Sequence, residues 1–219
     1  MADHTIKMFL KFGQKEHIKE LFESGTIYMN SIQYFRKIED GELRGDVYEG
    51  VSRIKNLPPG QFFIPELNHL GNYLSLHLRQ SYETVLGNIF SLYCISSHGC
   101  ANPKDFKIDT KINRFGSHCL FIKDNTKFIS LLENKLQELK MKYRLGFVEY
   151  YDKEQVNRDI NLFEKPLEFE YQKEFRIYIE RFSDKPFAFS IGSLSDIAEM
   201  HESIGVIETM KLQPLNEIF

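Results

Sequence analysis

Apolar and polar residues alternate along residues 166–182, which read Pro-Leu-Glu-Phe-Glu-Tyr-Gln-Lys-Glu-Phe-Arg-Ile-Tyr-Ile-Glu-Arg-Phe. A period of two places successive side chains on opposite faces of a strand, so the pattern predicts one amphipathic strand over this segment. A strand that only faces water would show the same pattern. The aromatic and β-branched residues from Phe175 to Ile179 favour a central strand instead. The predicted polar face carries Glu168, Glu170, Gln172, Glu174, Arg176 and Tyr178.

The remaining chain divides into strand and helix patterns with short breaks between them. Helices are expected where apolar residues recur every three or four positions, at 14–24, 125–141 and 193–200, and Ser31 is expected to cap a short helix. Residues 56–87 have no clean period, so we expect a loop with short strands there, suited to a target-recognition insertion. Strands are expected at 6–12, 26–29, 51–55, 88–97, 117–122, 144–151, 187–191 and 204–207.

Composition narrows the class of protein. The 219 residues are 42% hydrophobic and 14% aromatic, which predicts one ordered domain over 1–219. The formal net charge of −3 gives no general attraction to a phosphate backbone. We expect no membrane partner and a cytoplasmic location, because no apolar run is long enough to span a bilayer and the first residues lack a secretion signal.

Two clusters of polar residues could hold a metal ion. Three cysteines are an odd number, which fits reduced thiols better than disulfides, and we expect inert buried thiols and no metal. Residues 39–50 form an acidic, glycine-punctuated segment that could be a substrate or cofactor loop, a divalent-metal site or a solvated loop. Its candidate functional residues are Arg44, Asp46 and Glu49. The candidate zinc ligands are Cys94, His98, Cys100, His118 and Cys119.

The sequence Gln172-Lys173-Glu174 has the Gln-x-Glu spacing of the ADP-ribosyltransferase superfamily and is followed by a strand pattern, as in that family. The segment 171–176 is similar to one near the end of bacterial abortive-infection (phage-defence) proteins that resemble DarT-like transferases. The helix and glycine at 17–25 resemble the opening of the same group. The resemblance implies an α+β fold with a mixed, mainly antiparallel central sheet, split around a cleft and flanked by helices.

The resemblance also implies an activity and a set of roles. NAD would be the substrate, Glu174 would stabilise the oxocarbenium-like ribose, and Gln172 would align the acceptor, a nucleic acid or a protein. Lys11, followed by Phe12, stands near a position where the family usually has Arg or His. Either Ser91 or Tyr93 would help to hold the cofactor. The chain would act as a bacterial toxin or phage-defence effector, and an antitoxin is a candidate partner whose existence the sequence leaves open.

Two other functions remain open on the sequence. A metal-dependent nuclease could use Glu168, Glu170 and Lys173 together with Asp46. The chain could instead be a non-catalytic antitoxin or binding partner in a defence system. Loss of activity with EDTA would indicate the nuclease, and loss of NAD-dependent labelling on substitution of Glu174 would indicate the transferase.

Overall fold

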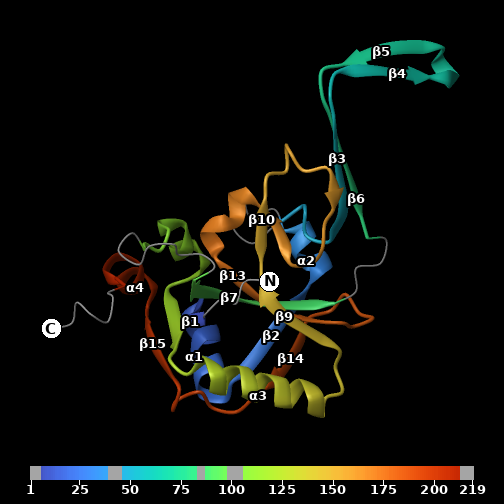
Figure 1. Ribbon diagram of the computed structural model, residues 1–219. Coiled ribbons are helices and arrows are strands. Elements are labelled where there is room, and N and C mark those ends of the chain that lie inside the picture. The colour runs from blue at the N-terminus through green and yellow to red at the C-terminus, as the bar shows by residue number, and fades with distance from the viewer. Residues whose placement is uncertain (1–5, 39–45, 83–86, 98–105, 213–219) are drawn as a thin grey trace.

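The computed structural model describes residues 6–38, 46–82, 87–97 and 106–212 (Figure 1). The fold is α+β, with a mainly antiparallel eight-stranded sheet in the order β14-β2-β7-β1-β8-β15, to which β13 and β9 add beside β7. The strands of this sheet are β1 (Ile6–Gly13), β2 (Thr26–Ser31), β7 (Asn88–Ser96), β8 (His118–Ile122), β9 (Tyr143–Phe147), β13 (Glu174–Ile179), β14 (Phe187–Ser190) and β15 (Ala198–Glu202).

The sheet divides at β7. One edge of β7 pairs with β1 through residues 93–96 and with β2 through residues 88 and 89. Between these two pairings, Lys11 Nζ donates a hydrogen bond of 2.7 Å to the carbonyl oxygen of Ser91. The opposite edge of β7 pairs with β13 along residues 88–93. Strand β13 also pairs with β9, so it lies inside the sheet as its aromatic and β-branched composition predicts.

Helices cover the sheet and close its main core. Helix α1 (Lys15–Ser24) buries Ile18 and Leu21, and it ends at Gly25, whose φ of 61° is favoured by glycine. Helix α3 (Asn125–Glu138) buries Phe128, Leu132 and Leu136 against the same core. The smaller helical elements are α2 (Ile32–Lys37), α4 (Ser203–Thr209) and the 3-10 turns η1 (Pro65–Leu67), η3 (Thr110–Phe115) and η4 (Leu167–Gln172).

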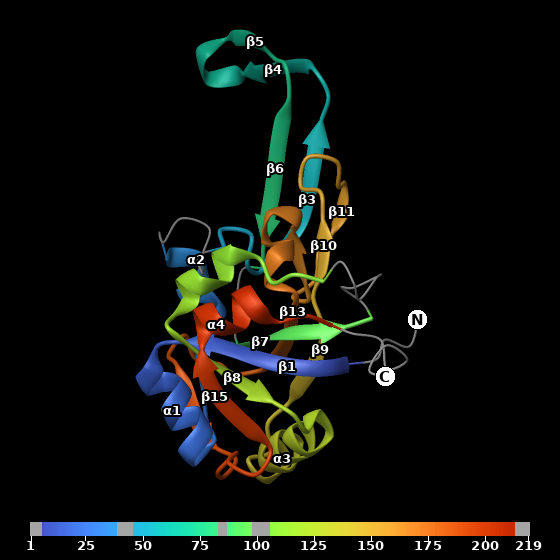
Figure 2. The same cartoon turned by 90° about the vertical axis from the view of Figure 1, so that its left-hand side faces the viewer.

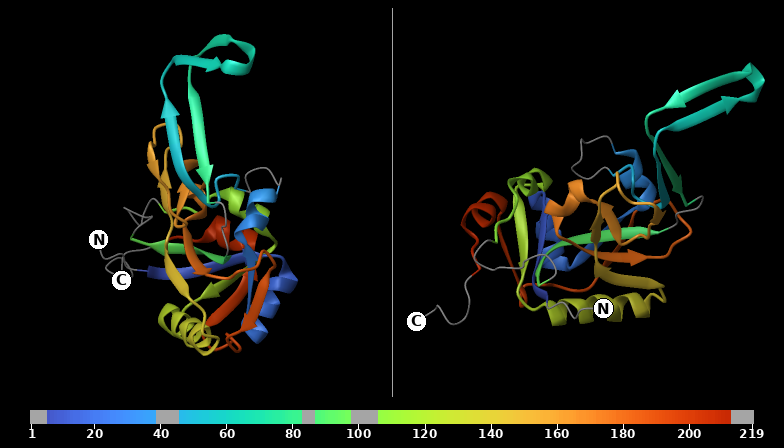
Figure 3. Two further views of the ribbon diagram at one scale, coloured as in Figure 1. Left: turned by 90° about the vertical axis from the view of Figure 1, so that its right-hand side faces the viewer. Right: turned by 45° about the horizontal axis from the view of Figure 1, so that its top comes forward.

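A long two-stranded arm projects from the body (Figures 1 and 2). Its stem pairs β3 (Val51–Leu57) with β6 (Leu76–Ser81), and its tip is the hairpin of β4 (Gly60–Ile64) and β5 (His69–Tyr73). Strand β11 (Arg158–Asp159) pairs with β3 at the base of the arm. Beside this base, β10 (Glu149–Tyr151) pairs in parallel with β12 (Glu164–Pro166). Figure 3 shows the tip well separated from the sheet and helices of the body.

Several predicted elements are confirmed, with small changes at their ends. Strands lie where the pattern places them near 6–12, 26–29, 51–55, 88–97, 117–122 and 187–191. The helices expected at 14–24 and 125–141 are also present. The cap at Ser31 is confirmed, since its hydroxyl accepts a hydrogen bond of 3.1 Å from the Tyr34 amide. The segment 144–151 is divided, because it supplies both β9 and β10.

Two predictions of secondary structure are wrong. The segment 166–182 is not one strand, because β12 pairs beside β10 and the chain must turn through η4 before it enters β13. The expected helix at 193–200 and the strand at 204–207 are exchanged: β15 pairs with β8, and α4 packs its buried Ile207 on the second core. In both places, pairing with distant strands overrides the local pattern. The short strands expected within 56–87 are present as β4, β5 and β6, and together with β3 they form the arm; residues 83–86 lie outside the described part of the chain.

Candidate active site

The central carboxylate is positioned by a turn and a strand. Lys173 adopts a left-handed conformation with φ of 40°, which ends η4 and directs the chain into β13. The Lys173 carbonyl accepts a hydrogen bond of 2.8 Å from the Cys94 amide, so the turn remains attached to β7. Within β13, Phe175 and Ile177 enter the main core. Glu174 and Arg176 therefore lie on the opposite face.

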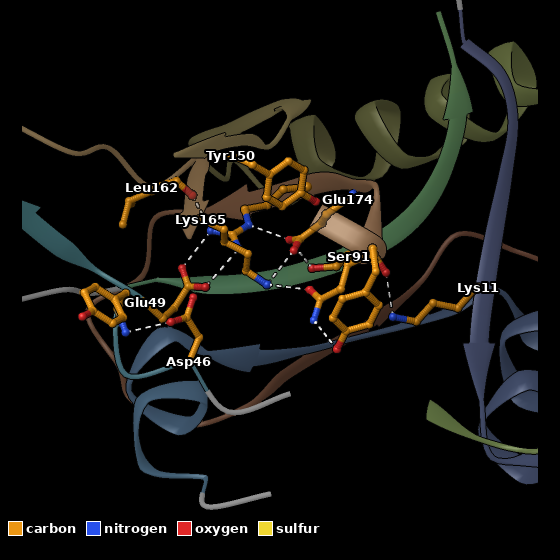
Figure 4. A network of polar contacts seen from close by, with 12 residues as sticks. Lys11, Asp46, Glu49, Ser91, Tyr150, Leu162, Lys165 and Glu174 are labelled. Carbon is orange, nitrogen blue, oxygen red and sulfur yellow. Dashed lines mark hydrogen bonds and ion pairs between the residues drawn. The ribbon is translucent and has the colours of Figure 1, made fainter. Parts of the chain in front are cut away.

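Glu174 is 3% exposed and accepts three charge-assisted or hydroxyl hydrogen bonds (Figure 4). Its Oε1 accepts bonds from Ser91 Oγ at 2.6 Å and from Arg176 Nε at 2.7 Å. Its Oε2 lies 2.8 Å from Lys165 Nζ. A carboxylate has about four acceptor positions on its two oxygens. Among the residues that the structure describes, these contacts occupy three of them and leave one on Oε2.

Arg176 joins this carboxylate to the acidic segment. Its NH1 and NH2 bind the two oxygens of Glu49 at 2.7 and 3.0 Å, which is the paired geometry that a guanidinium offers to a carboxylate. NH1 also donates to the carbonyl oxygen of Leu162. Arg176 is buried, as is Glu49. The guanidinium thus lies between two carboxylates that are 125 residues apart in the chain.

Lys165 links the two residues of the Gln-x-Glu motif. Its ammonium, on β12, lies 2.8 Å from Glu174 Oε2 and donates a bond of 2.9 Å to Gln172 Oε1. Gln172 and Glu174 are therefore brought together, but by the Lys173 turn and this bridge rather than by strand alternation. Sequence reasoning missed Lys165. Its position, seven residues before Gln172, carries no pattern that indicates the contact.

The charges around Glu174 keep it ionised. Burial by itself would raise the pKa of this carboxyl, but the nearby charges of Arg176 and Lys165 and their hydrogen bonds outweigh burial and hold the pKa well below its usual range. Burial would likewise lower the pKa of Arg176, and the two carboxylates it contacts raise it instead. Glu174 therefore carries its negative charge at neutral pH, paired with two cations.

Two depressions meet at Glu174. The first, which we call the Lys11 depression, has a volume of about 80 Å³ and lies where the sheet divides. The second, the Tyr150 depression, has a volume of about 190 Å³, and its wall includes Tyr150, Glu170 and Lys173. The Lys11 depression brings together the predicted site residues Lys11, Phe12, Ser91, Tyr93, Gln172 and Glu174, with Ile112 and Phe115.

Lys11 places a third cation near Glu174, after Arg176 and Lys165. Its Nζ lies 4.3 Å from the centre of the Phe90 ring, in addition to its bond to the Ser91 carbonyl. Burial lowers the pKa of this amine to about 8, although the charge of Glu174 acts in the other direction. An ammonium that is half-buried and easily deprotonated is suited to contact an anionic or hydroxylated ligand.

The acidic segment reaches the site only in part. Asp46 is buried, its Oδ1 accepts a bond of 2.7 Å from the Tyr48 amide, and burial together with Glu49 raises its pKa to about 6. Arg44 lies outside the described residues. Glu168, named for a nuclease, pairs instead with Lys153 at 2.7 Å. The alternation that placed it on one face with Glu174 is broken by η4.

Cys94 and Cys119 are buried free thiols. Burial raises the pKa of both Cys94 and Cys119 to about 12. His98 and Cys100 lie outside the described residues. Within the described ranges, no three His, Cys, Asp or Glu side chains gather as a metal ion would need. None of the helices in those ranges combines the length and apolar character that crossing a bilayer requires.

Comparison with known proteins adds no relative to this picture. The chain matches no protein-family model, no curated protein and no solved structure. Its function must therefore be argued from the site itself.

Proposed function

We propose that this protein is an NAD-dependent ADP-ribosyltransferase that acts as a bacterial toxin or phage-defence effector on a nucleic acid or protein acceptor. The observation that carries the proposal is the Lys11 depression. Six side chains named from the sequence for NAD or acceptor contact line this single depression, although they come from three separate strands and a turn. They form three pairs that are close in sequence, and the pairing of β7 with β1 and β13 brings the three pairs together.

Glu174 has the properties that the chemistry requires. In the transfer, the bond between the ribose C1′ and the nicotinamide nitrogen breaks, and its electron pair leaves with nicotinamide. The C1′ centre becomes positively charged, and a nearby ionised carboxylate lowers the barrier by several kcal/mol. Glu174 is held ionised by Arg176 and Lys165, and the remaining acceptor position on Oε2 suits a ribose hydroxyl.

The neighbouring side chains support binding and orientation. The aromatic rings of Phe12, Tyr93 and Phe115 give the depression apolar walls for a flat ring. Gln172 has its amide oxygen bound by Lys165, which fixes the side chain beside the carboxylate. Its amide group would align the acceptor, whose nucleophilic atom forms the new bond to C1′ and releases a proton to water.

The test is NAD-dependent labelling. Purified protein is incubated with NAD labelled in its adenylate part and with total cell RNA, DNA and protein. We expect label in one of these fractions, and Glu174→Gln to reduce it at least a hundredfold, because the uncharged amide removes the electrostatic stabilisation. Gln keeps the size of the side chain, so folding is checked by circular dichroism and thermal unfolding.

A matched control is Glu180→Gln. Glu180 directly follows β13 and has Lys142 as a surface partner at 3.6 Å, away from both depressions. Labelling by this variant should equal that of the unmodified protein. Equal labelling by folded Glu174→Gln would contradict the proposal. Absence of labelling in all three fractions, together with EDTA-sensitive cleavage of nucleic acid, would replace it with the nuclease.

A further inference from the structure

A single buried ammonium contacts both residues of the Gln-x-Glu motif. Lys165 is only 7% exposed, and lysine is seldom buried unless its charge is paired. Its Nζ lies 2.8 Å from Glu174 Oε2 and 2.9 Å from Gln172 Oε1, and 5.4 Å from the centre of the Phe169 ring (Figure 4). An ammonium carries three N–H donors. Lys165 directs two of them at the motif.

The backbone of Lys165 is fixed independently of the residue that it holds. It lies on β12, where it is paired with Tyr150 of β10. Gln172 lies instead at the end of η4, directly before the Lys173 turn, and it is half-buried. A glutamine side chain has considerable rotamer freedom, and a hydrogen bond to a charged donor offsets the loss of that freedom. A strand residue therefore restrains a side chain that extends from a turn.

The ammonium also decides which end of the Gln172 amide faces it. Because an ammonium has donors and no acceptor, only the amide oxygen can lie against it. The amide nitrogen lies on the other side, 3.4 Å from the hydroxyl of Tyr171, whose ring packs on the second core. A half-turn of the amide would bring N–H donors of Gln172 against those of Lys165. The buried charge thus excludes the reversed amide.

The ion pair with Glu174 does not by itself account for a lysine at this position. Arg176 Nε already binds Glu174 Oε1 at 2.7 Å. A buried ion pair often contributes no more stability than apolar side chains of similar volume. The contact that distinguishes Lys165 is the one to Gln172, an uncharged residue that lines the Lys11 depression together with Glu174.

We infer that Lys165 is a positioning residue of the proposed transferase, which holds the Gln172 amide in one orientation so that the acceptor, and not water, attacks the ribose C1′. This inference rests on the proposed function, in which Gln172 aligns the acceptor. In both reactions the bond between C1′ and the nicotinamide nitrogen breaks, and its electron pair leaves with nicotinamide. The nucleophilic atom of the acceptor, or the oxygen of water, then bonds to C1′ and releases a proton to the solvent. Lys165 therefore controls the ratio of transfer to hydrolysis.

The test measures both products of one reaction. The protein is incubated with NAD labelled in its adenylate part and with total cell RNA, DNA and protein. Label attached to macromolecules and free ADP-ribose are counted separately, and released nicotinamide gives the total. Lys165→Met should lower the ratio of transfer to hydrolysis at least about tenfold, because a small misplacement of an aligning group costs about a hundredfold in rate. Both products come from folded molecules, so the ratio does not depend on how much of the variant folds.

Two further variants identify the route of the effect. Lys153→Met is the matched control, because Lys153 also pairs with a glutamate, Glu168, at 2.7 Å but lines neither depression. It should leave the ratio unchanged. Lys165→Met combined with Gln172→Ala should lower the ratio no further than Gln172→Ala alone, since the lysine acts through that amide.

Three results would overturn the inference. Two of them are a ratio that is unchanged in Lys165→Met and a ratio that Lys165→Met lowers equally with and without Gln172, and both leave the proposed function in place. The third is the loss of all nicotinamide release in Lys165→Met and also in Lys165→Gln, whose side chain is uncharged and one atom shorter, because the lysine would then act on NAD cleavage through Glu174. No nicotinamide release by the unmodified protein is a separate result, which contradicts the proposed function and the inference with it.

Discussion

Arg176 offers a direct measure of how much the buried charges at the site stabilise the fold. Arg176→Met keeps a long apolar side chain but removes the guanidinium from Glu174 and Glu49, which bind it at 2.7 Å each. Both carboxylates are buried, so water cannot replace the lost contacts. Removing one partner of a buried ion pair costs about 3–5 kcal/mol.

The magnitude is large relative to the total stability. A domain typically unfolds at a cost of about 5–15 kcal/mol, and for 150–250 residues each kcal/mol shifts Tm by about 2–4 °C. We therefore expect Arg176→Met to lower Tm by about 6–20 °C at pH 7. Urea unfolding followed by circular dichroism gives the same free energy independently.

The pH dependence has a defined sign. Burial alone would raise the pKa of Glu174, but the charges of Arg176 and Lys165 outweigh burial and lower it in the folded protein. The stabilising contribution of Glu174 is therefore present above its unfolded pKa, near 4.5. The contribution is lost as pH falls below that value toward the folded pKa. The difference between the unmodified protein and Arg176→Met should thus be largest at neutral pH and shrink below about pH 4.

The control for this prediction is Arg144→Met. Arg144 lies on β9 opposite Tyr178 of β13, with its guanidinium exposed over the Phe163 ring at 4.8 Å. Its loss should cost about 0.5–1 kcal/mol, the value of an exposed cation–π contact. If Arg176→Met costs no more than this control, the reasoning from buried charges is refuted.

Two further predictions follow from the titrating groups near the site. Burial and Glu49 raise the folded pKa of Asp46 to about 6, because both disfavour its charged form. Asp46→Asn should therefore raise Tm at pH 7.5, and this gain should vanish as pH falls from 6 to 4. A gain in Tm that is constant with pH would contradict this prediction. Burial lowers the pKa of the Lys11 amine to about 8. In NMR spectra of the protein with ¹³C-dimethylated lysines, one signal should therefore titrate near pH 8, whereas exposed lysines titrate near 10.4. The signal that titrates near pH 8 should be missing in Lys11→Arg.

Local pattern was sufficient for most of the fold. The three-to-four spacing in α1 and α3 and the apolar run of β7 identify elements whose local preference and tertiary role agree. The pattern failed at 193–200 and 204–207, where pairing of β15 with β8 decides the structure. It also failed at η4, because alternation over six residues cannot distinguish a strand from a turn that buries only Phe169.

The sequence by itself placed a glutamate and a glutamine two residues apart next to a strand with an apolar face, and this motif led to the chemistry that we propose for position 174. Only the tertiary structure decided which charges surround that glutamate. Lys165 and Arg176 meet at Glu174, and Glu49 binds the far side of Arg176, because β12, β13 and the turn before β3 converge beside β7. Contacts between charges depend on distance in space, and the distance between these residues along the chain carries no trace of it.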